Sequence, residues 1–178
     1  NFRPDSPWKA VPALLQARRA LAQLPDGFWP ALTREQLDRV IAHAIGLDLE
    51  SIADQRSAHP GSSLELTINA IQRSPFNVEL SLKTLQGQPL PKPQSRTLPS
   101  NELQKLQLSH SIPESTEISQ PYWLRQPASQ GRYNVDEQSL VGKPENAPAL
   151  PVTVNITVEG ESFSFEIPTQ HKANNPVH

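Results

Sequence analysis

Proline restricts this chain more than any other residue type. The sequence has 19 prolines among its 178 residues but only 7 glycines, whereas proline makes up about 5% of an average protein. Proline lacks a backbone N–H and fixes one backbone dihedral angle, so it stays out of helix interiors and central strands. This composition favours stiff connections and strand ends over flexible linkers.

The overall composition excludes several classes of protein. The balance of 16 Lys and Arg against 18 Asp and Glu, a net charge of -2, argues against a polybasic nucleic-acid binder. No apolar run approaches the ~18 residues that a membrane-spanning helix needs. Cysteine is absent, which excludes disulfides, zinc-thiolate sites and a cysteine nucleophile. Because the chain starts at Asn1 and has no Met, we expect a piece of a larger protein.

The first 46 residues predict a helical hairpin. Ser6-Pro7 is typical of a helix start, with an N-cap residue followed by proline in the first turn. Residues 24–27 (Leu-Pro-Asp-Gly) predict a break. Apolar residues recur at helical spacing on both sides of this break, namely Val11, Leu14, Leu15 and Leu21, then Leu37, Val40, Ile41, Ala44 and Ile45.

The bounds of the second helix follow from its flanking residues. Residues 33–36 (Thr-Arg-Glu-Gln) fit a capping box, in which Thr33 and Gln36 would each bond a free backbone N–H. Gly46 suits the position just after a helix. We expect Phe28 and Trp29, in the break, to pack between the two helices.

Beyond Gly46 the apolar period changes from helical to alternating, which predicts strands. Alternation is clear over 63–72, 76–85 and 152–158, while 103–108 is ambiguous between strand and helix. Glu159-Gly160 predicts a hairpin turn, and the prolines at 89, 91 and 93 forbid a central strand there. The expected core consists of Leu64, Leu66, Ile68, Val78, Leu80, Leu82, Val152, Val154, Ile156, Val158, Phe163 and Phe165.

This pattern predicts a mainly β fold in two parts. Residues 1–46 would form the helical hairpin, as a linker or packing element. Residues 47–178 would form an antiparallel, immunoglobulin-like β-sandwich, because short alternating strands separated by turns are typical of sandwiches.

Candidate ligand-binding residues lie in the turn-rich segment 112–151. Tyr122 and Trp123 stand close to Arg125 between two prolines. Such a loop can offer an aromatic platform to a sugar or stack an arginine on tryptophan. It can equally be fixed to the sandwich by its aromatic rings, and we favour this structural reading, with Trp123 as the buried anchor.

The sequence offers no catalytic or metal-binding constellation. The histidines, His43, His59, His110, His171 and His178, lack the spacing of metal ligands. Nucleophile-elbow, P-loop and dinucleotide-binding motifs are absent. Asp136, Glu137 and Glu145 are interpreted as solvated loop carboxylates, since nothing pairs them as acid and base.

Several motifs carry a resemblance to a known family. They are Gln120-Pro121-Tyr122-Trp123-Leu124, residues 131–135 (GRYNV) and residues 140–146 (LVGKPEN), supported by residues 20–27, residues 45–50 and Arg73-Ser74. Together they span most of the chain, from the first helix to His171-Lys172. This combination resembles the region that follows the catalytic domain in large bacterial PIG-L (LmbE-like) deacetylases.

The resemblance implies a function for the parent protein. The family hydrolyses N-acetyl groups of amino sugars with zinc, held by a His-Pro-Asp-Asp-Glu motif and a further histidine. The nearest string here, His59-Pro60-Gly61-Ser62-Ser63, lacks the carboxylates that bind zinc and activate water. We therefore expect no cofactor and no catalytic residue in this piece, with the zinc in a missing catalytic domain. The family also favours a periplasmic or extracellular location.

Three functional hypotheses follow. In the first, the chain is a non-catalytic accessory part of such a deacetylase, positioning the catalytic domain of the same chain or its substrate. In the second, it is a stand-alone carbohydrate- or protein-binding module led by Tyr122, Trp123 and Arg125. In the third it is an independent enzyme, which no constellation supports. We expect neither a nucleic-acid partner nor a membrane span.

Overall fold

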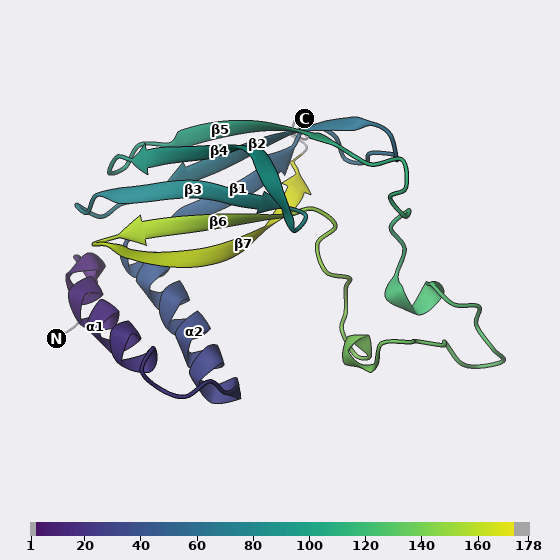
Figure 1. The fold of residues 1–178 in the computed structure, drawn as a ribbon, viewed down its shortest axis with the longest axis horizontal. Coiled ribbons are helices and arrows are strands. Elements are labelled where there is room, and N and C mark those ends of the chain that lie inside the picture. Colours follow the sequence, from purple (N-terminus) through teal and green to yellow (C-terminus); the bar gives the residue numbers. More distant parts are fainter. Residues whose placement is uncertain (1–2, 173–178) are drawn as a thin grey trace, which may run out of the picture.

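The computed structural model describes residues 3–172, with side chains for 3–90 and 94–172. It is mainly β: seven strands form one curled, mixed sheet. A helical hairpin lies at one end of the sheet, and a long segment without strands, between β5 and β6, projects from the other end (Figure 1). The two ends of the sheet therefore differ: one carries the helical hairpin and the other carries the long segment.

The helical region is a hairpin, as predicted. A 3-10 turn, η1 (Pro7–Ala10), leads into α1 (Val11–Leu21), and α2 (Phe28–Ala44) follows after the predicted break. Ser6 occupies the N-cap position of η1, although its side chain makes no capping hydrogen bond. Pro12 lies in the first turn of α1, where a missing N–H costs nothing.

The expected start of the second helix is wrong. α2 begins at Phe28, before the supposed capping box, and Thr33 Oγ1 donates to Trp29 O at 2.8 Å inside the helix. The helix starts earlier because Pro30 fits a first turn, whose N–H groups have no helical partner. Phe28 and Trp29 do not pack between the helices either. Each is 72% exposed, and their rings meet edge to face at 5.2 Å.

The stretches of clear alternation, 63–72, 76–85 and 152–158, each lie largely within a strand. Residues 103–108, left ambiguous by the sequence, belong mostly to a strand, β5. The bounds are β1 (Asp48–Ala53), β2 (Ser63–Ile71), β3 (Val78–Leu85), β4 (Gln88–Leu98), β5 (Gln104–Ser111), β6 (Pro151–Val158) and β7 (Glu161–His171). The turn at Glu159-Gly160 has positive φ at both residues, 49° and 78°, as a two-residue hairpin turn of this kind requires.

The sheet is mixed, which corrects the expectation of a purely antiparallel one. Its order is β4-β3-β6-β7-β1-β2-β5. All pairings are antiparallel except the one between β1 and β7, where Ser51, Ile52 and Ala53 run parallel to residues 169–171. β7 pairs with β6 along residues 161–168 and with β1 only at its end. It thereby joins two halves of the sheet.

The proline-rich strand β4 is an edge of this sheet. The prolines at 89, 91 and 93 therefore stay out of the sheet centre, as their missing N–H groups demand. The sheet curls enough to bring the β4 edge near the β5 edge, and Gln94 Nε2 donates to Gln107 O at 3.2 Å between them.

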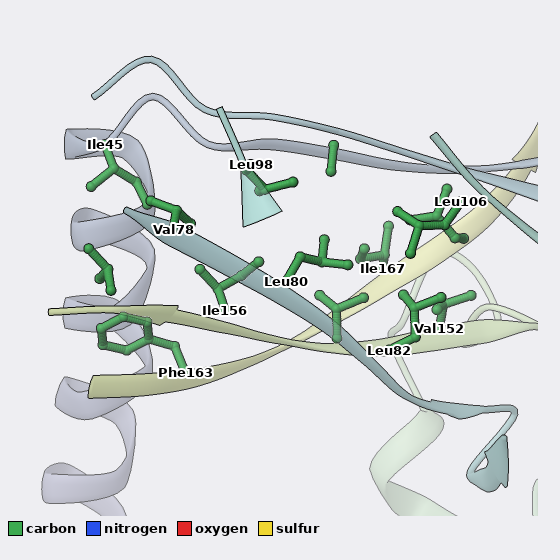
Figure 2. Close-up of a cluster of buried hydrophobic side chains, with 14 of the residues drawn as sticks. Ile45, Val78, Leu80, Leu82, Leu98, Leu106, Val152, Ile156, Phe163 and Ile167 are labelled. Carbon is green, nitrogen blue, oxygen red and sulfur yellow. The ribbon is translucent and has the colours of Figure 1, made fainter. Parts of the chain in front are cut away.

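The buried side chains of the curled sheet face one interior (Figure 2). All the expected core residues are buried except Phe165, which is half-buried against the same cluster. Five residues of the hairpin region belong to this core as well, namely Val11, Leu15, Ile41, Ala44 and Ile45. The hairpin thus covers one end of the apolar interior.

Candidate binding surface on the arm

Residues 112–150 leave the sheet after β5 and return at β6, and we call them the arm. The arm carries only two short 3-10 turns, η2 (Tyr122–Leu124) and η3 (Gln138–Leu140). Figure 1 shows it in green, extending away from the strands. This agrees with the prediction of a turn-rich segment, whose prolines prevent regular strands.

Tyr122 ties the outgoing and returning parts of the arm together. It is only 9% exposed, and its hydroxyl donates to Lys143 O at 3.1 Å. Its backbone N–H donates to Asn146 Oδ1 at 3.0 Å, and Asn146 Nδ2 in turn donates to Gln120 O at 2.7 Å. Three hydrogen bonds thus close a loop of about two dozen residues. They offset part of the conformational entropy that this loop loses when it becomes ordered.

Trp123 lies beside this anchor and is half-buried. Its ring meets that of Tyr122 edge to face, with centroids 4.9 Å apart and planes at 89°. The sequence pointed to Trp123 as the buried anchor, but the structure gives that place to Tyr122. Trp123 is instead part of the wall of an open hollow lined by Tyr122, Trp123, Arg132, Tyr133, Val135, Gln138 and Val141.

Arg125, the third candidate, does not line this hollow. It lines a neighbouring groove together with Glu117, Gln120, Glu137 and Asn146. In the described part of the chain, the arginine that stacks on an aromatic ring is Arg18, 4.7 Å from the centroid of Phe163. The structure therefore joins Tyr122 and Trp123 in one hollow and places Arg125 next to it.

Sequence reasoning missed Arg132 and Tyr133 as partners of Trp123. Tyr133 is 62% exposed and contributes the second accessible ring of the hollow. The available signal in the sequence was Gly131, because glycine favours turns with positive φ. In the structure its φ is +75°. That turn brings the following residues back towards η2, which spacing alone does not reveal.

The loop carboxylates and the histidines remain scattered. Asp136 Oδ2 accepts from Gln126 Nε2 at 2.8 Å, and Glu137 accepts from the Ser139 hydroxyl. Burial lowers the pKa of His110 below its usual value. Within residues 3–172, no three His, Asp or Glu side chains are grouped so that they could hold a metal ion; His178 lies outside the described residues.

Comparisons with known proteins add little to this geometry. No known protein family and no curated protein matches the sequence. Solved structures give weak likenesses. The sporulation control protein Spo0M from Bacillus subtilis is 12% identical over 71% of this chain and 50% of its own, with a TM-score of 0.30. The chain spans half of the length of Spo0M.

Two further likenesses are of the same kind. A CARDB domain from Pyrococcus furiosus, solved with di-metal ions, is 9% identical over 69% of this chain and 86% of its own, with a TM-score of 0.33. The alkylpurine DNA glycosylase AlkC from Pseudomonas fluorescens is 11% identical over 86% of this chain and 42% of its own, with a TM-score of 0.28.

Among the described residues, no helix has the length and apolar character to cross a bilayer.

Proposed function

We propose that this chain is a non-catalytic accessory module of a larger PIG-L-like deacetylase, and that it positions the catalytic domain or its substrate. The observation that supports this proposal is the hydrogen-bonded loop of the arm. The motifs at 120–124 and 140–146, which carry the family resemblance, are the segments joined by Tyr122, Lys143 and Asn146. These side chains and carbonyls fix the shape of the arm, and a region that positions another domain or its substrate must itself have a fixed shape.

The finer fold assignment belongs to the same proposal. We infer an immunoglobulin-like sandwich in which β7 passes from one layer to the other. Its pairing with β6 along most of its length and with β1 at its end supports this reading. The buried faces of both halves share one core, as the two inner faces of a sandwich do.

The proposal is tested first in the gene and then in the enzyme. The reading frame upstream of Asn1 should encode a domain with a His-Pro-Asp-Asp-Glu motif. In that parent enzyme, Tyr122→Ala should slow acetate release from a polymeric acetylated amino sugar and leave release from the monosaccharide unchanged. Phe28→Ala is the matched control, because that ring is 72% exposed on the helical hairpin, lies outside the arm hollow and forms none of the three arm-closing hydrogen bonds.

Two results would overturn this function. An upstream frame without the motif removes the deacetylase assignment. Acetate release by the isolated chain, at a rate that survives extensive repurification, would make the chain itself an enzyme.

A second candidate function is glycan binding at the arm hollow. The observation that favours it is the pair of accessible rings, Trp123 and Tyr133, with Arg132 and Gln138 beside them. Stacked aromatic faces and adjacent hydrogen-bonding groups are the features that hold a sugar ring in a site.

Calorimetric titration with a chitin tetrasaccharide and a cellulose tetrasaccharide tests this second function. If it holds, Trp123→Ala abolishes the measured affinity and leaves the melting curve unchanged. Trp29→Ala is the matched control, since Trp29 is exposed on the helical hairpin and outside the hollow. Absence of binding to either sugar, together with a lowered melting temperature of Trp123→Ala, favours the purely structural role of Trp123.

A further inference from the structure

The two ends of the curled sheet are closed in different ways. At one end the helical hairpin inserts Val11, Leu15 and Ile41 into the core. At the other end a cavity of about 460 Å³ remains between residues 55–60, the roots of the arm and the end of β7. We call it the end cavity. Its volume lies in the range of about 300–1,000 Å³ that is typical of small-molecule sites.

The floor of the end cavity is apolar and continuous with the core. Leu64, which is 3% exposed, and Ala53, which is 7% exposed, line it from β2 and β1. Ile112 and Leu150 line it from the two roots of the arm. A ligand that reaches this floor removes apolar surface from water, so its body must itself be apolar.

The rim of the cavity is polar. Arg56 is the lining residue with a permanent positive charge, and Glu117, on the outgoing root of the arm, is the lining carboxylate. In the part of the chain that the structure describes, neither forms an ion pair. The rings of His59 and His171 are held in place, with Nδ1 3.0 Å from Pro60 O and 3.2 Å from Ala53 O respectively.

We propose that the end cavity binds a small amphiphile with an apolar body and one carboxylate. The body lies on Leu64, Ile112 and Leu150, and the carboxylate pairs with the guanidinium of Arg56, whose planar fork fits a carboxylate. Glu117 disfavours a second negative charge on the ligand, because like charges at close range repel. This inference does not depend on the proposed function, since the arm hollow and the end cavity have separate linings.

Calorimetric titration of the full chain with octanoate tests the proposal. Octanoate should bind one to one, and hexanoate roughly tenfold more weakly, because two fewer methylenes are buried. Octylamine and the dicarboxylate azelate should bind at least several-fold more weakly than octanoate. These comparisons separate the apolar contribution from the charge contribution.

Variants of the chain locate the site. Arg56→Gln should weaken octanoate binding roughly three- to tenfold through loss of the charge-assisted hydrogen bonds. Arg96→Gln, an exposed arginine on β4 outside the cavity, should leave the affinity unchanged. Ala149→Trp places a large ring in the mouth from an exposed loop position and should abolish binding, with its melting curve as the check on folding.

The contrary results are equally definite. If octanoate does not bind at millimolar concentration, the proposal is wrong. It is also wrong if a folded Ala149→Trp variant binds octanoate like the unmodified chain, because the ligand then lies elsewhere. If the unmodified chain binds octanoate and octylamine equally tightly, and Arg56→Gln does the same, the assignment of a carboxylate ligand fails.

Discussion

Gly46 ends α2 with a backbone that other residues adopt poorly. Its φ is +62°, its N–H donates to His43 O at 3.0 Å, and the N–H of Leu47 donates to Ala42 O at 2.9 Å. This pair of bonds is the Schellman arrangement, which satisfies carbonyls left free at a helix end. Arg73 packs directly against this turn and donates from its guanidinium to Gly46 O at 3.1 Å.

Gly46→Ala should lower the free energy of unfolding by about 2–4 kcal/mol, from the left-handed backbone and from overpacking. A Cβ at this position would lie 2.8 Å from Cβ of Arg73, so the loop after β2 must shift. The measurement is urea unfolding at equilibrium. Gly87→Ala is the control, because Gly87 has a φ of +74° but no atom within 4 Å of the added Cβ, and it should lose only about 1–2 kcal/mol. Equal losses in the two variants would show that the Arg73 contact costs nothing.

The role of Gly46 as a helix end followed from the sequence, whereas its contact with Arg73 did not. Helix ends are local, so a glycine after an apolar helical stretch is a readable signal. Arg73 is 27 positions further on, and it reaches Gly46 only because β1 and β2 pair and bring their ends together. Sequence spacing carries no information on that pairing.

At the scale of elements, Arg18 connects the hairpin to the sheet. From α1 it donates to Asp38 of α2 at 2.6 and 3.3 Å, to Glu161 at 3.3 Å and to Ser162 O at 3.0 Å. Its guanidinium also stacks on Phe163. One half-buried side chain therefore joins two helices and the β6–β7 hairpin, in a network that fixes their relative position.

Glu161 makes the junction between the helical hairpin and the sheet, formed by the contacts of Arg18, sensitive to pH. The hydrogen bond from Arg19 and the charges of Arg19 and Arg18 hold the pKa of Glu161 below its usual value, against the opposing effect of burial. A lowered pKa in the folded state means that the stabilisation is complete above the unfolded-state pKa and is lost as the pH falls through the folded-state pKa. The junction should therefore weaken in acid.

Glu161→Gln should flatten the fall in stability on the acid side. The measurement is the urea midpoint of the variant and of the unmodified chain at a series of pH values from neutral to acid. Glu35→Gln is the control, because Glu35 pairs only with Arg39 on the same helix, and exposed pairs of this kind contribute about 0.3–0.5 kcal/mol. If Glu161→Gln and the unmodified chain lose stability in parallel, Glu161 is not responsible for the acid dependence.

The elements themselves were predictable to different degrees. Strands β2, β3 and β6 followed from alternation, because successive side chains of a strand point to opposite faces. The start of α2 failed, because Thr33-x-x-Gln36 is equally compatible with a helix interior, where Thr33 bonds the carbonyl of Trp29. Of the candidate site, Tyr122 and Trp123 were found from their unusual setting, but which of them is buried depends on Asn146 and Lys143, more than twenty residues away.

At the scale of the whole molecule, the feature that the sequence could not provide is the parallel pairing of β1 with β7. It joins residues 51–53 to residues 169–171. Alternation shows which side chains face the core, but it does not name the partner strand. The consequence is that the last two strands lie between β3 and β1 in the sheet, with two earlier strands, β2 and β5, on the far side of β1.

This strand order makes a prediction about cutting the arm. The fragment after the arm carries only β6 and β7, yet these strands occupy the centre of the sheet and contribute Val152, Val154, Ile156 and Phe163 to the core. If the recognition site of a sequence-specific protease is inserted after Gly131, where added atoms meet open space, cleavage should leave both fragments in one complex.

Size-exclusion chromatography of the cut protein should give a single peak at the mass of the uncut chain, and the far-ultraviolet circular dichroism should keep its β signal. Unfolding of the cut protein should become concentration-dependent, because refolding is then a bimolecular association. The same insertion between Glu159 and Gly160, in the tight turn joining β6 to β7, is the control and should destabilise the protein before any cut. Separate elution of the two arm-cut fragments with loss of the β signal would show that β6 and β7 are held by the arm and not by the sheet.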